Sequence, residues 1–327
     1  MEVMNRTILF LLLVGSLAII DACNDSDDPG KKAKFKQDTL ILGYFRDNAI
    51  TNYQQDNSGF YYYVIDSVTD PSAKTISDGQ VLTINYTVAV VGGSVIESID
   101  SVKLKQGAGA IFPTSLDPAL ALMKEGEEYG FVFPSNLAFG DFQFSTLIPS
   151  NSVLHYQVRL AEIQNDTELN QEESAEINDY VFQVKLDSNY LWADTSFLKR
   201  LPSGLICKTL SSGGALQPVQ GDELTLHYTG RFLDSAQFDI RGIADPFIYN
   251  FGSNRTIPGF EEALTYMSIG ERSLFIIPSR LAYQESAIVI PSLLTDEMVA
   301  MDILPTYASS IPPFHPLLFE IELISIN

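Results

Sequence analysis

The sequence predicts an α+β fold class, with two similar domains in tandem. The first observation is an internal repeat, because Gly126-Glu127 recurs as Gly270-Glu271 and Leu137-Ala138 recurs as Leu281-Ala282, both 144 residues later. The second is a closing segment of alternating apolar residues in each copy, which is typical of a half-buried strand in an antiparallel sheet. The third is a set of apolar residues at helical spacing in each copy. Several strands with one short helix make an α+β domain of about a hundred residues. The strand residues are Leu154, Tyr156, Val158 and Leu160, then Leu317, Phe319, Ile321 and Leu323; the helix residues are Leu116, Leu120 and Met123, then Phe260, Leu264 and Met267.

Residues 1–22 have the pattern of a signal peptide rather than of folded structure. Arg6 precedes an apolar run that begins at Ile8, and this run is too short and too early for a membrane span. It ends at Ile20-Asp21-Ala22-Cys23, which resembles the lipobox of bacterial lipoproteins. The resemblance implies that Cys23 becomes an acylated N-terminus that anchors the chain in a membrane. An ordinary cleaved signal peptide is the alternative.

Residues 23–37 are predicted to form a flexible tether. The stretch 24–32 is polar and turn-rich and has almost nothing to bury. The acidic cluster directly after Cys23 resembles the surface-export signal of Bacteroidetes-type lipoproteins. The expected location is therefore the cell envelope, lipid-anchored to the outer membrane and facing either the periplasm or the surface.

The repeat divides the rest of the chain into three parts. A first domain with a short leading helix is predicted over 38–164, and a second domain over 203–327. Between them, 165–202 is predicted to be a solvated acidic linker and helix, because residues 162–179 hold seven acids and no Lys or Arg. Acidic residues near a helix N-terminus are mildly favourable.

Charge and composition exclude some classes of function. The chain carries 41 acidic and 20 basic residues, for a net charge of −21, which argues against a nucleic-acid partner because phosphate binding needs a basic face. Cys207 is predicted to be a buried free thiol. His155 and His227 are expected on outward strand faces and His315 in a Pro-rich turn, so no metal site is expected.

One stretch of the second copy has the composition of a ligand pocket. Tyr228, Phe238, Phe247 and Phe260 supply enough aromatic surface to line a concavity, with Asp239 as the acid set beside them. Small-ligand sites are usually apolar with one or two placed polar groups. The alternative interpretation is that these residues are only the core of a β-rich domain.

At this point the second copy resembles the FKBP family of peptidyl-prolyl cis/trans isomerases over about residues 203–327. The resemblance implies a bent antiparallel β-sheet wrapped around a short α-helix in each domain. It also implies isomerisation of proline-containing polypeptide clients, a reaction that uses no cofactor. The matching segments are Gly221-Asp222, His227-Tyr228-Thr229-Gly230, Phe238-Asp239, Pro246-Phe247, Ile257-Pro258-Gly259-Phe260, Met267, Gly270-Glu271, Leu281-Ala282-Tyr283, Ile311-Pro312-Pro313 and Phe319-Glu320-Ile321-Glu322-Leu323.

The same resemblance implies the roles of the site residues. Phe260 stands where the family most often has Trp at the pocket floor. The Ile257 N–H and the Tyr283 hydroxyl fall where the family hydrogen-bonds substrate carbonyls. The catalytic set is expected to be Tyr228, Phe238, Asp239 and Tyr283, and the substrate-binding set Phe247, Thr256, Ile257, Phe260, Ile311 and Phe319.

The first copy resembles the family over about 58–164 but departs from it at the pocket. Tyr86 is kept, whereas aliphatic residues replace most of the aromatic walls and Phe139 replaces the hydroxyl-bearing tyrosine. We expect this domain to be structural or protein-binding and without isomerase activity. The remaining replacements are Ile96, Glu97, Val102, Leu116 and Tyr156.

The second copy carries an apolar insert at 284–310, which makes it 19 residues longer than the first copy after Tyr283. Loops of this length are usually functional or structured in themselves. The insert is therefore expected to cap the pocket or to present a client surface. Because fold does not fix function, a non-catalytic chaperone or an envelope scaffold are the competing hypotheses.

Overall fold

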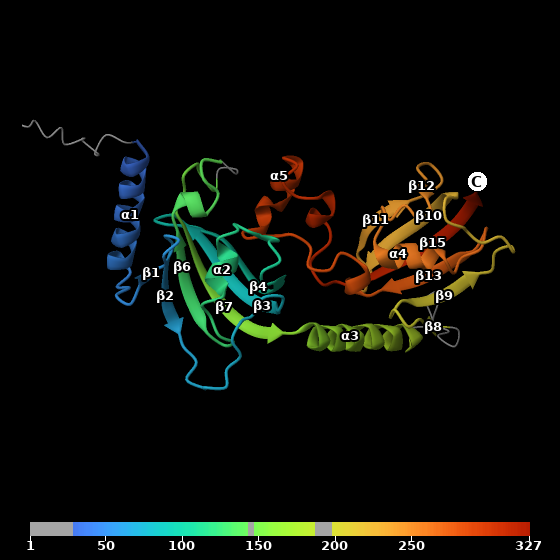
Figure 1. The fold of residues 1–327 in the computed structure, drawn as a ribbon, viewed down its shortest axis with the longest axis horizontal. Coiled ribbons are helices and arrows are strands. Elements are labelled where there is room, and N and C mark those ends of the chain that lie inside the picture. Colours follow the sequence, from blue (N-terminus) through green and yellow to red (C-terminus); the bar gives the residue numbers. More distant parts are fainter. Residues whose placement is uncertain (1–28, 143–146, 187–197) are drawn as a thin grey trace, which may run out of the picture.

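The computed structural model describes residues 29–142, 147–186 and 198–327 of the chain (Figure 1). The predicted signal peptide at 1–22 and Cys23 lie outside the described residues. Among the described helices, none combines the length and the hydropathy that crossing a bilayer requires.

The first domain is built on a six-stranded antiparallel sheet in the order β1-β2-β6-β7-β3-β4. One side of β7 alternates as the sequence predicts, with Leu154, Tyr156, Val158 and Leu160 buried against α2. The elements are β1 (Gln54–Gln55), β2 (Tyr61–Asp66), β3 (Val81–Val90), β4 (Val95–Lys105), β5 (Ile111–Phe112), α2 (Leu116–Leu120), β6 (Glu128–Phe133), η2 (Ser135–Leu137) and β7 (Leu154–Gln164).

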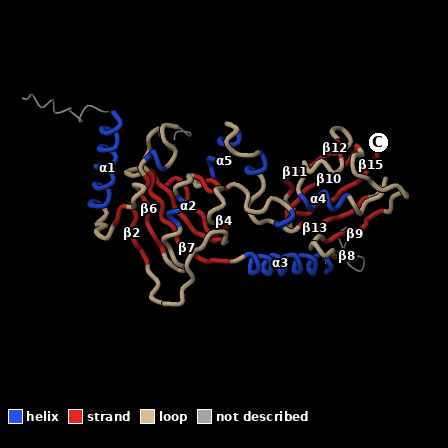
Figure 2. Tube along the Cα trace, viewed as in Figure 1, coloured by secondary structure: helices blue, strands red, loops and turns tan. Residues whose placement is uncertain are grey.

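The second domain repeats this plan with the strand order β11-β10-β15-β13-β9-β8, and β12 pairs with β10 (Figure 2). Pro258 begins its helix at a position where a missing N–H costs nothing, and Phe260 and Leu264 are buried on its inner face. The predicted α+β class is confirmed in both domains. The elements are β8 (Lys199–Arg200), β9 (Ile206–Ser211), β10 (Glu223–Phe232), β11 (Gln237–Arg241), β12 (Phe247–Asn250), α4 (Pro258–Leu264), β13 (Arg272–Ile277), η4 (Ser279–Leu281) and β15 (Leu317–Ile326).

A helix precedes each domain and covers the outer face of its sheet. In α1 (Pro29–Asp47) the residues Ile41 and Phe45, one turn apart, are buried against the first sheet. Residues 29–37 of the segment expected to be a tether are therefore helical, because α1 runs through them. In α3 (Asp166–Leu186), Ile177 packs in the same way on the second sheet.

The second of these helices begins at Asp166, and its first turn is capped. The Asn165 side chain accepts hydrogen bonds from the N–H groups of Thr167 and Glu168, at 2.9 and 3.0 Å. The Glu168 carboxylate in turn accepts from the Asn165 N–H at 2.8 Å. This reciprocal arrangement is a capping box, and the Asn-x-x-Glu spacing was its signal in the sequence.

Helix α3 also connects the two domains, so its acids are not simply solvated. Glu172 pairs with Lys103 of β4 at 2.6 Å, and Glu168 pairs with Lys74 at 3.2 Å. On the other side, both oxygens of Glu173 accept from the Ser279 N–H of the second domain at 3.1 Å. Exposed ion pairs of this kind contribute about 0–1 kcal/mol each, whereas the Glu173 carboxylate is buried.

Two residues differ in burial from the prediction: His155 is more buried than expected and Cys207 is less buried. His155 does lie on the outer face of β7, but α1 covers it, and the Tyr44 and Tyr63 hydroxyls lie 3.2 and 3.0 Å from its ring nitrogens. Burial lowers the pKa of His155 to about 4. Cys207 is free as predicted but only half-buried, and partial burial raises the pKa of its thiol.

The insert of the second domain departs from that domain and packs on the first. Its strand β14 (Ile288–Val289) pairs in parallel with β5, and Figure 1 shows α5 (Thr295–Ala300) between the two domains, away from α4. Five of its residues belong to the buried core of the first domain. They are Val289, Ile290, Leu294, Met298 and Leu304. The insert also contains η5 (Ser292–Leu294) and η6 (Thr306–Ser309). Within the described residues, the Phe112–Pro113 and Ile290–Pro291 bonds are cis.

Candidate functional site

The predicted aromatic residues of the second domain surround the ring of Tyr228. The rings of Phe247, Phe260 and Phe319 lie 5.6–5.7 Å from it, all in edge-on arrangements. Phe238 continues the cluster through an edge-on contact with Phe319 at 5.6 Å. Edge-on contacts of this kind are favoured by the aromatic quadrupole, so the rings of this aromatic cluster hold one another in place.

Five separate elements bring these rings together. Tyr228 comes from the middle of β10 and Phe319 from its partner β15. Phe238 and Phe247 come from β11 and β12, the two strands that pair with opposite ends of β10. Phe260, which is 3% exposed, stands in the first turn of α4 and closes the floor.

A glycine on β10 allows the closest of these approaches. A Cβ atom on Gly230 would lie 2.6 Å from the ring of Phe238 and 3.1 Å from the ring of Phe319. Any side chain at this position would therefore push both rings away from the strand. Nothing in the local sequence pattern identified Gly230 as a site residue.

Asp239 holds Tyr228 in place rather than pointing freely into the pocket. The Tyr228 hydroxyl donates a 2.5 Å hydrogen bond to one Asp239 oxygen, and the other oxygen accepts from the Ile240 N–H at 2.8 Å. Burial, and then this bond to a carboxylate, raises the pKa of Tyr228. The structure therefore gives Asp239 a positioning role toward Tyr228.

Two hydrogen-bond donors beside the aromatic cluster have no partner within the part of the chain that the structure describes. These are the Ile257 N–H and the Tyr283 hydroxyl. The Ile257 carbonyl is engaged, because it accepts from the Phe260 N–H at 3.0 Å at the start of α4. Burial raises the pKa of Tyr283, so its hydroxyl stays protonated and can donate.

The other two predicted contact residues lie at the edge of the cluster. The Thr256 hydroxyl donates to Glu261 at 3.4 Å and so faces the first turn of α4. Ile311 is 3% exposed and packs in the core of the second domain.

Tyr307 was not predicted as a site residue, yet its ring lies 4.7 Å from that of Tyr283. It belongs to the insert, whose position no sequence pattern indicated.

Family comparison agrees with this geometry. The family model for the FKBP-type peptidyl-prolyl cis-trans isomerase matches residues 72–161 and 214–324 of this sequence. Together these are more than half of the chain. The chain belongs to this family. Both of its sheet domains are thus FKBP domains, and the predicted resemblance is confirmed for each.

Three curated relatives show how much of the chain is shared. The chain is 34% identical over 124 residues to the FKBP-type 22 kDa peptidyl-prolyl cis-trans isomerase of Escherichia coli, covering 38% of this chain and 50% of that protein. It is 37% identical over 106 residues to FKBP11 of Bos taurus, covering 32% and 43%. It is 35% identical over 130 residues to the macrophage infectivity potentiator of Trypanosoma cruzi, covering 39% and 56%. The chain thus spans about half the length of these relatives.

The strand register places the residues of the first FKBP domain that replace the aromatic walls. Val102 pairs with Ile84 as Phe247 pairs with Leu226, so Val102 stands at the Phe247 position. In the same way, Tyr156 pairs with Phe131 as Phe319 pairs with Phe275. The first pocket also has no counterpart of the free Ile257 N–H, because the equivalent position is Pro113, whose carbonyl accepts from Leu116 at the start of α2.

The first FKBP pocket keeps the tyrosine–carboxylate pair, but the insert occupies it. Tyr86 donates to Glu97 at 2.5 Å, as Tyr228 does to Asp239. The Glu97 carboxylate also accepts from the N–H and the hydroxyl of Ser292, at 2.7 and 2.6 Å. The buried Tyr156 hydroxyl donates to the Ile290 carbonyl at 2.9 Å. The insert was expected to cap its own pocket or to present a client surface, but it fills the pocket of the neighbouring domain.

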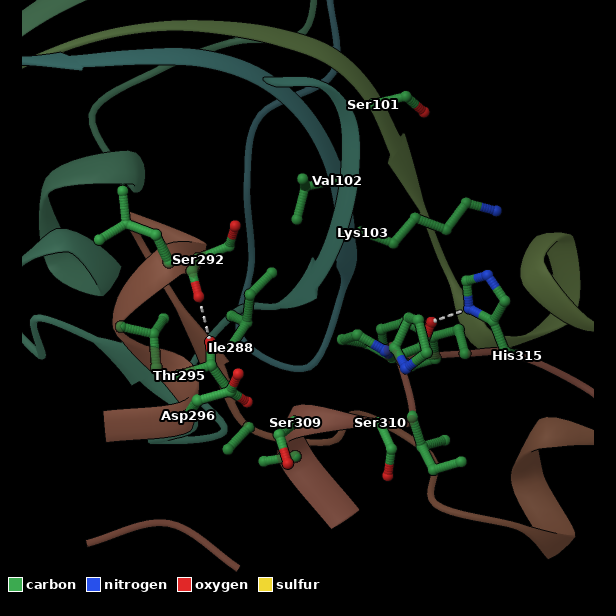
Figure 3. A pocket seen from close by; sticks show the side chains of 18 of the residues that line it. Ser101, Val102, Lys103, Ile288, Ser292, Thr295, Asp296, Ser309, Ser310 and His315 are labelled. Carbon is green, nitrogen blue, oxygen red and sulfur yellow. Dashed lines mark hydrogen bonds between the residues drawn. The ribbon is translucent and has the colours of Figure 1, made fainter. Parts of the chain in front are cut away.

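A separate cavity of about 650 Å³ lies between the two FKBP domains (Figure 3). Lys103 of β4, Asp296 of the insert and His315 line it, and the His315 ring turns back toward its own segment through a contact with the Pro313 carbonyl at 2.9 Å. Ile311 belongs to both this cavity and the edge of the aromatic cluster. The cavity is therefore adjacent to the aromatic pocket but distinct from it.

Proposed function

We propose that the second FKBP domain is a peptidyl-prolyl cis/trans isomerase that acts on flexible proline-containing segments of client polypeptides. The observation that carries this proposal is the aromatic cluster around Tyr228, beside which two donors have no partner among the described residues. Aromatic walls suit an apolar proline ring, and the Ile257 N–H and Tyr283 hydroxyl suit the carbonyls on either side of it.

The physics of the reaction fits such a pocket. Rotation about an X–Pro bond breaks amide resonance, at a barrier of roughly 20 kcal/mol, and it forms no covalent bond. The twisted amide has less charge separation than the planar one, so a dry aromatic environment stabilises it relative to the ground state. Donors that hold the flanking carbonyls fix the chain on both sides while the bond turns.

The experiment is a prolyl-peptide isomerisation assay on the full chain. The Phe247→Ala variant removes a pocket wall, and Ile248→Ala is its matched control, because Ile248 is the next residue on β12 and is 52% exposed. We expect catalysis by the parent chain and by Ile248→Ala, and a loss of roughly tenfold or more in kcat/KM for Phe247→Ala. Absence of any rate above background in the parent chain would refute the proposal.

A non-catalytic chaperone is the second candidate, and the occupied first pocket favours it for that domain. In this case the surface that binds client proteins would lie outside the aromatic pocket of the second domain. The discriminating variant is Phe238→Ala with Tyr283→Ala. If suppression of client aggregation persists unchanged in this variant while isomerisation is lost, binding and catalysis use different surfaces.

We also propose that the chain is a lipoprotein of Bacteroidetes type, anchored to the outer membrane through Cys23 and acting on envelope proteins. The support is the lipobox-like Ile20-Asp21-Ala22-Cys23 and the acidic cluster after it. A Cys23→Ser variant should move from the membrane fraction to the soluble fraction and lose label from a radioactive fatty acid. Cys207→Ser, which changes the other cysteine of the chain, is the control and should keep both properties. Equal labelling of the two variants would exclude lipidation at Cys23.

A further inference from the structure

The contacts of the insert with the first FKBP domain use the groups that define its pocket. Both oxygens of Glu97 accept from Ser292, and one of them also accepts from Tyr86. Two residues earlier, the carbonyl of Ile290 accepts from the buried Tyr156 hydroxyl. Pro291, which is itself buried, lies between these two anchors. The segment Ile290-Pro291-Ser292 is therefore held at both ends by the side chains that line the pocket.

Backbone pairing and apolar burial extend the docking on both sides of this segment. The N–H groups of Ile288 and Ile290 donate to the carbonyls of Ala110 and Phe112, each at 2.9 Å. Ile290 and Leu294 are fully buried, although the chain reaches them from the second domain. Undocking would expose the apolar residues of both the insert and the pocket, which carries a cost in free energy.

Both ends of the insert return to the mouth of the second pocket. At its start, the Gln284 carbonyl accepts from the Phe314 N–H at 2.8 Å. At its end, η6 places Tyr307 against Tyr283, and the Tyr307 carbonyl accepts from the Ile311 N–H at 2.8 Å. Docking of the insert in the first domain therefore fixes a residue at the rim of the second pocket.

We propose that the pocket of the first FKBP domain is a receptor for the proline segment of the insert within the same chain. The class of ligand that it takes is an extended aliphatic segment followed by Pro and Ser, with the Ser supplying two donors to Glu97. A polypeptide of the same chemistry occupies this pocket only by displacing the insert, which carries Tyr307 away from Tyr283. This docking is independent of whether the second domain catalyses isomerisation.

The first experiment measures amide hydrogen exchange of residues 286–304 in the full chain. Glu97→Ala and Ser292→Ala remove the two partners of the central contact. The matched controls are Asp239→Ala, at the equivalent carboxylate of the second domain, and Ser309→Ala, a serine of the insert whose hydroxyl bonds only within η6 among the described residues. We expect exchange at 286–304 to accelerate at least tenfold in the first two variants and to stay unchanged in the controls.

Protection of β3 and β7 in the same data shows whether each variant remains folded. Exchange at 286–304 that is as slow in Glu97→Ala as in the parent chain would overturn the proposal. Protection that weakens on dilution would overturn it too, because the insert would then dock on a second copy.

The second experiment measures binding of a synthetic peptide with the sequence of residues 286–294, so that the proposal does not depend on one variant. The Ser292→Ala chain should bind it at least tenfold more tightly than the parent chain does, because its own insert competes less well. A peptide with Pro291 replaced by Ala should bind more weakly than the parent peptide. Equal affinities of the two chains for the peptide would contradict intramolecular docking.

Discussion

The Glu97 carboxylate accepts two hydrogen bonds from Ser292, a residue 195 positions later in the chain. Its counterpart in the second domain, Asp239, accepts from Tyr228 and from its neighbour Ile240. The two pockets thus share a tyrosine–carboxylate pair and differ in what lies against it. The insert occupies the first pocket, whereas the second keeps two unpaired donors at its mouth within the described residues.

Removing the Tyr283 hydroxyl should lower catalysis without affecting stability. The hydroxyl has no hydrogen-bond partner within the described parts of the chain, so Tyr283→Phe breaks nothing in the free protein. A lost hydrogen bond to a substrate carbonyl is worth about 1 kcal/mol, which corresponds to roughly a fivefold lower kcat/KM. Isomerisation kinetics check the lower kcat/KM, and thermal unfolding of the same sample checks the unchanged stability. An unchanged kcat/KM would show that this hydroxyl does not contact the substrate.

A methyl group on β10 should disturb the aromatic pocket. In Gly230→Ala the new Cβ would overlap the ring of Phe238, and overpacking of this kind costs about 1–3 kcal/mol of folding stability. The displaced rings should also reduce kcat/KM by roughly tenfold. Gly242→Ala is the control, because its Cβ would meet no atom within 4 Å. Equal stability and activity of the two variants would mean that Phe238 adjusts freely.

The buried His155 predicts a pH dependence for the first domain. Its folded pKa of about 4 lies below the ordinary value of 6.5, so between these values the unfolded chain binds the extra proton. The contribution of His155 to the free energy of unfolding is therefore fully present above about pH 6.5. It is lost as the pH drops toward 4, and the loss is about 3 kcal/mol at most.

Chemical unfolding at pH 7 and at pH 4.5 measures this contribution. In a His155→Gln variant the loss of stability between the two pH values should be smaller than in the parent chain. The carboxylates that titrate in this range affect both proteins alike, so the difference isolates the histidine. An identical pH dependence would show that the pKa of His155 is the same in the folded and unfolded states.

The sequence predicted most of the fold because its signals are local. The alternation in 154–160 and 317–323 and the 144-residue repeat are confirmed as strands and as two FKBP domains. The aromatic residues of the second copy also meet around one ring, as the pattern indicated. Local patterns suffice for these strands, because the alternation shows which face of each strand is turned toward the core.

The features that the sequence did not predict depend on contacts between distant segments. Nothing near Ser292 indicates that its partner is Glu97, and the aliphatic run before it fits equally well against either domain. The position of Tyr307 follows from that docking and was missed with it. Likewise, the exposure of His155 depends on α1, which lies more than a hundred residues earlier.

The most direct test is to map where a proline-containing peptide binds on the full chain, by hydrogen exchange at a saturating concentration of the peptide. We predict protection of 226–241, 256–260 and 281–283 around the second pocket, with unchanged exchange at 288–304. Protection confined to the first domain, with faster exchange at 288–304, would contradict the assignment of the second pocket as the working site.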